Sequence, residues 1–182
     1  MIWAHNSHVG NHACNEFGWD MGMHSLGQLL KAQSESATAA IGFGTRAGTF
    51  LAATAPDGVC ATFPVLPARP HSWDAVCHQA GVPRFLLDLR HPTQALLETR
   101  LQRGSGSVYQ PVGDDASDYY DASPGGQYDA WVWFEQSRAL RPLPGAARPA
   151  LEPDWPFGSD DQSSVRSSNS SGNSTTSSIL RR

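Results

Sequence analysis

Apolar runs that suit β-strands alternate along most of the chain with segments of helical spacing. Runs rich in β-branched and aromatic residues predict strands at residues 1–4, 39–43, 49–52, 84–89, 107–109 and 130–134. Apolar side chains recur as on one face of a helix at residues 25–33, 72–80 and 93–102. The expected helix N-caps are Ser25, Ser72 and Thr93. Because strands alternate with helices, the sequence predicts an α/β domain with a largely parallel sheet.

The pattern changes after residue 143. Residues 144–158 carry repeated prolines, which remove backbone donors and fix φ, so they predict a Pro-rich extension without regular elements. Residues 159–182 are mostly Ser, Asp, Asn, Gly and Thr and cannot bury enough apolar surface to fold, so they predict a disordered tail. The folded domain is therefore expected over residues 1–143.

Composition and charge exclude several classes of protein. The 182 residues include 13 Lys and Arg against 17 Asp and Glu, a net charge of −4 without a basic stripe, so no nucleic-acid partner is expected. The longest weakly polar run, residues 38–55, contains Arg46 and several glycines, so we expect no membrane-spanning segment. The first residues lack the charged leader and apolar core of a secretory signal, which indicates a cytoplasmic protein.

The most unusual polar segment follows the first predicted strand. His5, Asn6 and His8 come directly after residues 1–4, and polar groups at the strand ends of an α/β sheet commonly line a ligand site. An imidazole can accept a proton or donate a hydrogen bond to a developing oxyanion, so His5 and His8 are the candidate catalytic residues. Asn6 is a candidate for binding and orienting substrate.

Two other interpretations of these histidines stay open. Their rings can simply satisfy backbone groups in a polar loop. Alternatively, His5, His8 and His12 on one helical face would supply three imidazoles to a zinc ion. Asn, Ser and Gly between them make a poor helix, so no metal is expected.

Arg90 directly follows the predicted strand at residues 84–89 and could hold a substrate carboxylate or polarise a carbonyl. The alternative is an ion pair with Asp88 or Asp74. If all the strand ends meet, Arg90 should line one cleft with His5 and His8.

Familiar cofactor and nucleophile motifs fail on inspection. The glycines at residues 42–48 do not have the spacing of the dinucleotide fingerprint and favour a tight turn between two strands. A Gly-x-Ser-x-Gly elbow is also missing from the sequence. No cofactor is expected.

Several stretches resemble the C-terminal portion of the erythromycin esterase family. They are IWAHNSHVG at 2–10, LGQLL at 26–30, IGFGTRAGTF at 41–50, PARPHSWDAVCHQAGVPRFLLDLR at 67–90 and FEQSRALRPL at 134–143. Their order and spacing match over almost all of residues 1–143.

The resemblance implies an α/β fold with a helical region and hydrolysis of a carboxylic ester by histidine-activated water. In characterised members the ester is the lactone of a macrolide antibiotic, which connects the family with antibiotic resistance. The family's His-Asn-x-His segment matches His5 and His8, which are implied to lie in the active-site cleft. The family's glutamate and the histidine usually taken as the base belong to an N-terminal Gly-Glu-x-x-His-Gly-like segment that this sequence lacks.

Two hypotheses follow. The chain is the C-terminal part of an ester or lactone hydrolase and is inactive alone because the base is missing, or it is a non-catalytic remnant that binds a small ligand or a protein. Half of an α/β fold should expose apolar strand faces and an unpaired edge, so we expect marginal folding or self-association through the exposed sheet. The cleft should be open on one flank.

Overall fold

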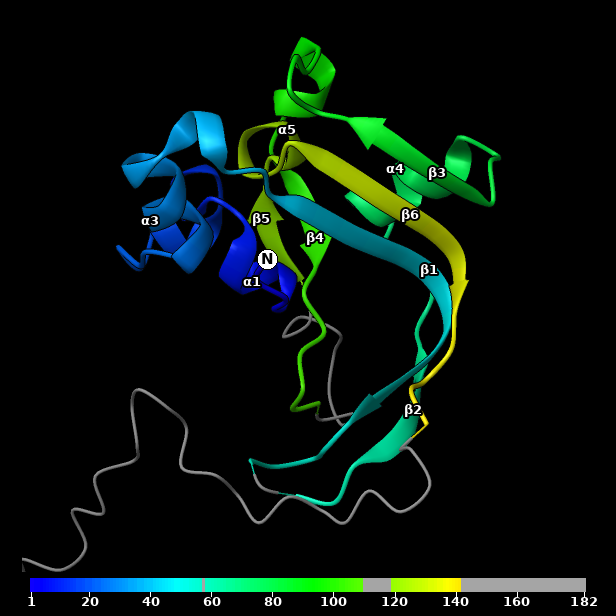
Figure 1. The fold of residues 1–182 in the computed structure, drawn as a ribbon. Coiled ribbons are helices and arrows are strands. Elements are labelled where there is room, and N and C mark those ends of the chain that lie inside the picture. The colour runs from blue at the N-terminus through cyan, green and yellow to red at the C-terminus, as the bar shows by residue number, and fades with distance from the viewer. Residues whose placement is uncertain (57, 110–118, 142–182) are drawn as a thin grey trace, which may run out of the picture. The chain divides into compact units, whose positions relative to one another are not determined.

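A four-stranded sheet forms the centre of the fold (Figure 1). The computed structural model describes residues 1–56, 58–109 and 119–141. The strands of the sheet stand in the order β2-β1-β6-β3 and are β1 (Ile41–Ala52), β2 (Ala61–Val65), β3 (Arg84–Asp88) and β6 (Ala130–Ser137). β1 runs parallel to β6, whereas β1 with β2 and β6 with β3 are antiparallel.

The α/β fold class is confirmed, but the prediction of a largely parallel sheet is wrong. β2 follows β1 after a short connection whose described residues form no helix, and a parallel pair would need a crossover of about a dozen residues or more. Pro64 lies in β2, which is an edge strand of this sheet, where a missing backbone donor is tolerated. The proline obscured this strand in the sequence pattern.

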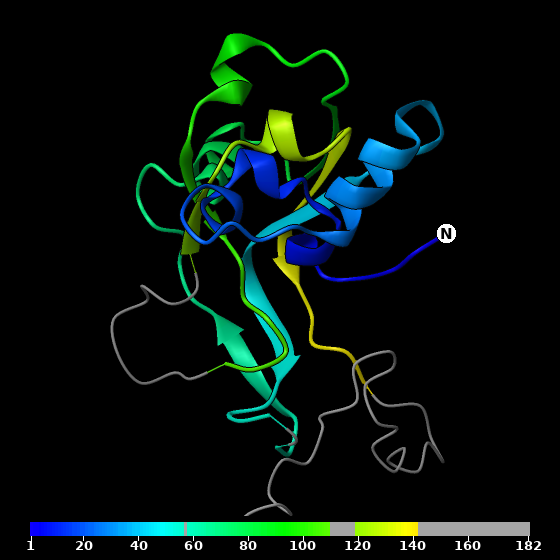
Figure 2. The same ribbon diagram turned by 90° about the vertical axis from the view of Figure 1, so that its left-hand side faces the viewer.

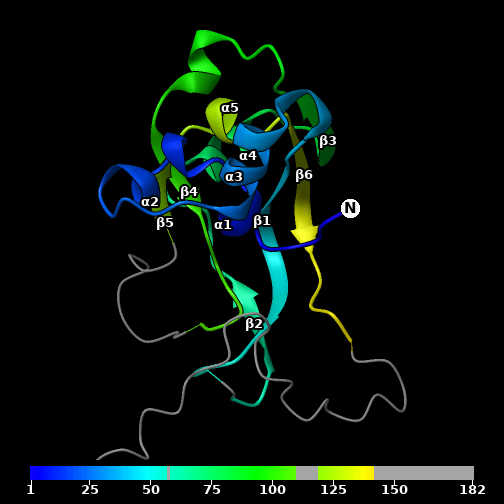
Figure 3. The same ribbon diagram turned by 60° about the vertical axis from the view of Figure 1, so that its left-hand side comes forward.

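The other elements are short and surround the sheet. They are α1 (Asn6–Val9), η1 (His12–Cys14), α2 (Glu16–Trp19), α3 (Leu26–Gln33), η2 (Glu35–Ala37), α4 (Trp73–Gln79), η3 (Gln94–Leu97), β4 (Arg100–Arg103), β5 (Tyr119–Ala122) and α5 (Pro124–Gln127). β4 and β5 form a separate antiparallel pair, which Figure 3 shows apart from the larger sheet. None of the described helices has the length and apolar character needed to cross a lipid bilayer.

Two of the three predicted helices are confirmed with their caps. The Ser25 hydroxyl accepts from the backbone N of Gln28 at the start of α3, and the Ser72 hydroxyl accepts from Ala75 N at the start of α4. The helix predicted at residues 93–102 is wrong, because only one 3₁₀ turn, η3, forms before the chain extends into β4. Its leucines therefore do not share one helical face.

The strand predicted at residues 1–4 is also wrong. These residues have no regular secondary structure. The Asn6 side chain hydrogen-bonds to the backbone N–H and carbonyl oxygen of Phe43 on β1, which are the groups that a further strand would have paired with. The Trp3 ring lies against the Phe43 ring, with their centroids 5.9 Å apart. Residues 107–109 likewise form only an isolated bridge, between Val108 and Ala53.

β1 is one long strand, so the tight turn expected at residues 42–48 is absent from this described segment. Gly42 and Gly44 lie flat against the Trp131 ring, where an added Cβ would come within 2.6 Å of ring atoms. Gly48 has φ +116° at the position where β1 leaves β6 and pairs with β2. The glycines therefore permit close packing against Trp131 and a bend of the strand, and Figures 1 and 2 show the curved course of β1.

The strands predicted at residues 84–89 and 130–134 are confirmed as β3 and β6 and carry the core on one face of the sheet. The core consists of Ala40, Leu89, Tyr128, Trp131 and Trp133, with partly buried hydrophobic residues such as Cys77 of α4 packed against it. All three cysteines are free.

A buried polar chain joins the N-terminal segment to β4 and α5. Asn15 donates to the Gln127 side chain at 2.7 Å, Gln127 donates to Gln102 at 3.0 Å, and Gln102 donates to the Tyr120 hydroxyl at 2.6 Å. Because buried polar groups are costly without partners, this chain of bonds specifies how these segments meet.

The opposite face of the sheet remains apolar and partly exposed. Ile41 and Phe43 of β1, Phe134 of β6 and Leu86 of β3 alternate with the core residues along their strands and share this face. Leu86 is 66% exposed and Phe134 is 41% exposed. The predicted exposure of an apolar sheet face is therefore present.

The extension at residues 144–158 and the tail at 159–182 lie outside the described residues.

Candidate active site

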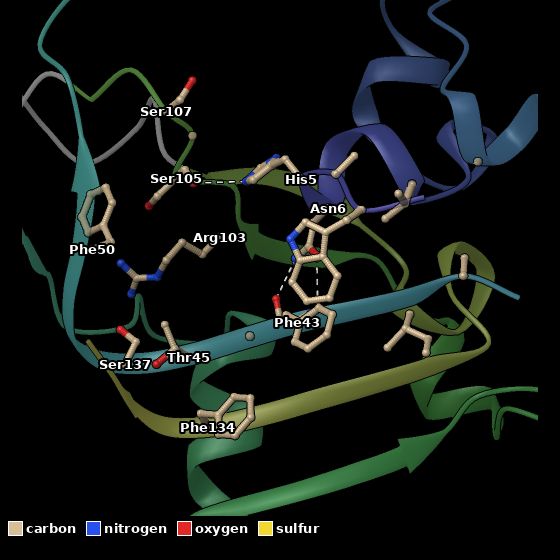
Figure 4. Close-up of a pocket in the computed structure, with 18 of the residues that line it drawn as sticks. His5, Asn6, Phe43, Thr45, Phe50, Arg103, Ser105, Ser107, Phe134 and Ser137 are labelled. Carbon is tan, nitrogen blue, oxygen red and sulfur yellow. Dashed lines mark hydrogen bonds between the residues drawn. The ribbon is translucent and has the colours of Figure 1, made fainter. Parts of the chain in front are cut away.

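An open cavity of about 990 Å³ lies between the N-terminal segment, β1, the residues after β4 and the end of β6. Figure 4 shows His5 and Asn6 on one side and the side chains of Arg103 and Ser105 on another. Aromatic side chains supply much of the remaining wall, namely Trp3, Phe43, Phe50 and Phe134. The cavity thus combines a mostly apolar lining with a few polar groups, as small-molecule sites commonly do.

His5 is fixed by both of its ring nitrogens. It is the N-cap of α1, and its Nδ1 accepts from Ser7 N at 3.2 Å and lies 2.9 Å from the Ser7 hydroxyl. Its Nε2 lies 3.1 Å from the carbonyl oxygen of Ser105. Because Nδ1 accepts a backbone hydrogen bond, the proton of the neutral ring is assigned to Nε2, which donates to Ser105.

The environment of His5 favours the neutral imidazole. Partial desolvation by the cavity wall lowers the pKa of His5 below its ordinary value of 6.5, and the nearby His8 lowers it further, against the raising effect of the Ser105 hydrogen bond. The ring is nevertheless exposed through the cavity mouth. A neutral imidazole at this position can donate a hydrogen bond to a ligand without carrying charge.

Asn6 docks this segment onto the sheet. Its side-chain amide donates to the carbonyl oxygen of Phe43 at 2.6 Å, and its side-chain oxygen accepts from Phe43 N at 3.1 Å. The side-chain nitrogen and oxygen of Asn6 therefore both bond to the backbone of Phe43, in the way that the backbone of a neighbouring strand would. Asn6 lines the cavity and holds His5 beside β1, while a direct contact of Asn6 with substrate stays a prediction.

The structure brings His8 near His5, with ring centroids 6.4 Å apart in an edge-to-face arrangement. His8 is exposed and, among the described residues, does not belong to the cavity lining. His12 is buried and its Nε2 bonds the Ser7 carbonyl oxygen instead. No group of three or more potential metal ligands occurs in the part of the chain that the structure describes, so the zinc interpretation gains no support.

Arg90 lies elsewhere. Its guanidinium donates to the Asp88 carboxylate, with Nε 2.9 Å from Oδ1, and these hydrogen bonds hold the pKa of Asp88 well below its usual range. Both side chains are exposed, and the described lining of the cavity does not include Arg90. Of the alternatives for Arg90, the ion pair with Asp88 is the one observed, and the expected single cleft with His5 and His8 does not form.

Sequence reasoning missed three charged residues as site residues: the described cavity lining includes Asp74, Arg103 and Arg138. Arg103, the last residue of β4, points its guanidinium into the cavity (Figure 4), and Asp74 of α4 also lines it. The Asp74 carboxylate accepts from Arg103 N at 3.1 Å, and burial raises the pKa of Asp74. The signal was the Gly-Ser-Gly-Ser run after residue 103, which marks a strand end once residues 100–103 are read as extended.

The comparisons agree with this architecture. A sequence model of the erythromycin esterase family matches residues 1–137. One similar solved structure is a protein from Bacillus cereus, with 20% identity and a TM-score of 0.61 over 75% of this chain and 33% of that one. A second is a succinoglycan biosynthesis protein, with 24% identity and a TM-score of 0.61 over 76% of this chain and 33% of that one.

A mutant of the erythromycin esterase EreC in its open conformation is also similar, with 18% identity and a TM-score of 0.50 over 73% of this chain and 31% of that one. At such identities these structures establish the fold alone. The chain spans about a third of the length of the solved structures it matches. Because the family's sequence model covers most of the chain, the protein belongs to the erythromycin esterase family.

Proposed function

We propose that this chain is the C-terminal part of a hydrolase that cleaves a carboxylic ester or a lactone by attack of histidine-activated water. The observation that carries the proposal is His5, an imidazole whose pKa is lowered and which lies on the wall of the large cavity. Membership of the erythromycin esterase family supports the reaction class. A cytoplasmic location and a contribution to antibiotic resistance belong to the same proposal.

In this proposal His5 acts as a hydrogen-bond donor. A base from the remaining part of the fold takes a proton from water, the hydroxide oxygen bonds to the carbonyl carbon, and the carbonyl oxygen becomes an oxyanion. The Nε2–H of His5 now donates to Ser105, and the substrate oxygen would take the place of that carbonyl. The Nε2–H of His5 stabilises this oxyanion. Collapse of the intermediate then re-forms the carbonyl double bond and breaks the bond to the alcohol oxygen, which takes the proton that the base removed from water. His8, whose ring centroid lies 6.4 Å from that of His5 and outside the described cavity lining, is assigned a supporting role beside His5.

The same geometry supports low activity of the isolated chain. Nδ1 of His5 faces Ser7, so the lone pair that a general base needs is already in use. In the described residues His5 hydrogen-bonds to no carboxylate that could stabilise an imidazolium. The base and its acidic partner would come from the two thirds of the matched structures that this chain does not cover.

The genomic DNA upstream of the Met1 codon provides the test. An in-frame stretch encoding Gly-Glu-x-x-His should be present, and the extended protein should hydrolyse an activated ester or a macrolide lactone. His5→Ala in that protein should lower kcat/KM by about a hundredfold or more, while His24→Ala, which removes an exposed histidine outside the cavity, should leave it unchanged. Equal activity of the His5→Ala protein and the parent would refute the role of His5.

A non-catalytic binding module is the second candidate. The observation that favours it is the engagement of both His5 nitrogens within the chain. A messenger RNA that starts just upstream of Met1, together with ligand binding but no turnover, would support this candidate over the hydrolase.

A further inference from the structure

Arg103 carries a charge into the cavity without an ion-pair partner in the described chain. Its guanidinium lies among the lining side chains in Figure 4, and no salt bridge of Arg103 is observed among the described residues, although the nearby Asp74 carboxyl interacts with it electrostatically. Its neighbour Asp74 uses its carboxylate on the backbone N of Arg103 and is only 2% exposed. The second arginine of the lining, Arg138, adds to the positive character of the cavity.

The side chain of Arg103 is held in place. Nη2 donates to the carbonyl oxygen of Leu66 at 2.8 Å, and the guanidinium lies 5.0 Å from the centre of the Tyr119 ring. Nε is buried and has no acceptor among the described residues. An arginine that is fixed by packing and still has free donors loses little entropy when it binds a ligand.

Arg103 also lies close to His5 along the cavity wall. Ser105, whose carbonyl oxygen is bonded by His5, follows Arg103 by two residues, which in an extended chain spans about 7 Å at most. Both side chains line the same cavity, so a ligand in it has access to the imidazole and to the guanidinium. Phe50 and Phe134 flank the same space with apolar surface.

We propose that Arg103 binds an anionic oxygen group, a carboxylate or a phosphate, on the molecule that occupies this cavity. The planar guanidinium presents paired donors that match either group, and the apolar surroundings strengthen the attraction. The substrate class is then an ester that bears an acidic group at a short distance from the scissile carbonyl. The ester part of this assignment rests on the proposed function, whereas the anion site rests on the geometry of Arg103 alone.

Ligand-observed NMR titration of the 182-residue chain tests the anion site without requiring turnover. The probes are benzoate and phenyl phosphate, with benzamide as the neutral match. We expect both anions to bind at least about tenfold more tightly than benzamide, and added salt to weaken the anions alone. The stronger of the two anions identifies the acidic group. Equal affinity for benzoate, phenyl phosphate and benzamide in the unmodified chain would overturn the proposal.

Variants locate the effect. Arg103→Gln should lower the affinity for the anions about tenfold or more and leave benzamide unchanged, and Arg103→Lys should have an intermediate effect. Arg84→Gln is the matched control, because Arg84 is exposed at the start of β3 and lies outside the described cavity lining. Anion binding that survives in folded Arg103→Gln, or that is lost in Arg84→Gln, would also overturn the proposal.

The two proposals fail in different ways. If the anions bind selectively through Arg103 but the protein extended at its N-terminus does not hydrolyse esters, the anion site stands and the hydrolase proposal is refuted. Hydrolysis of neutral esters that Arg103→Gln does not slow would leave the hydrolase standing and refute the anion site.

Discussion

The imidazole of His5 and the main-chain carbonyl of Ser105 meet at 3.1 Å although 100 positions separate them in the sequence. This bond closes one side of the cavity, because it joins the segment before α1 to the chain that leaves β4. It also keeps the Nε2 proton of His5 directed at the polar part of the lining. The candidate site therefore depends on a long-range contact rather than on the His-Asn-x-His segment alone.

His5→Gln should destabilise the chain through this contact and through the cap of α1. The loss of the Ser7 and Ser105 hydrogen bonds should lower the free energy of unfolding by about 1 kcal/mol, as measured by urea denaturation. His8→Gln is the matched control, since no hydrogen bond of the exposed His8 ring is observed within the described chain. Equal destabilisation by the two substitutions would contradict the structural role of His5.

The stability of the chain should fall on mild acidification because of His5. Its pKa is lowered in the folded state, so between that value and 6.5 the unfolded chain binds a proton that the folded chain does not. The contribution of the neutral His5 ring to the free energy of unfolding is thus complete above pH 6.5 and is lost as the pH falls through the pKa of the folded state. Urea midpoints across this range should drop more for the unmodified chain than for His5→Gln, and parallel curves would contradict the assignment.

Asp74 should be replaceable by Asn more easily than by Ala. Asn keeps an acceptor for Arg103 N, whereas Ala leaves that donor unpaired at a cost of about 1–3 kcal/mol. Burial raises the pKa of Asp74 above 3.8, so its favourable contribution is complete below 3.8 and is lost as the pH rises through the folded value. Asp74→Asn should therefore gain stability relative to the unmodified chain as pH rises, which urea titrations at several pH values can check.

The exposed apolar face of the sheet should cause self-association. Sedimentation velocity at micromolar concentration should show oligomers, and Leu86→Lys should shift the distribution toward monomer because it places a charge on the edge strand β3 of that face. Val59→Lys is the control. Val59 is also an exposed apolar residue, but it lies in the segment before β2 and not on this face. A monomer with a sharp, cooperative melt would instead indicate a self-sufficient domain.

The helices and central strands could be predicted because local signals determined them. Ser25 and Ser72 cap the helices that follow them, and the apolar strands β3 and β6 carry strong β-formers. The segment at residues 93–102 misled because Leu96, Leu97 and Leu101 have helical spacing, yet pairing with β5 draws residues 100–103 into a strand. Tertiary pairing overrode the local pattern there.

The candidate site was only partly predictable. His5 and Asn6 were found because polar residues follow an apolar run, although that run is not a strand and the strand-end argument does not apply to it. Arg103 and Ser105 approach them through the β4–β5 pair, a long-range arrangement that spacing along the chain does not encode. Arg90 was chosen by the same strand-end argument, but Asp88 lies two positions away and pairs with it locally.

Ester hydrolysis by the purified chain tests the central claim most directly. The 182-residue protein and its His5→Gln variant are compared at several concentrations with an activated ester and a macrolide lactone. Both proteins are expected to hydrolyse each substrate at the uncatalysed rate, because the proposed base belongs to the two thirds of the matched structures that this chain does not cover. Turnover that rises with the concentration of the unmodified chain and disappears in His5→Gln would contradict this expectation.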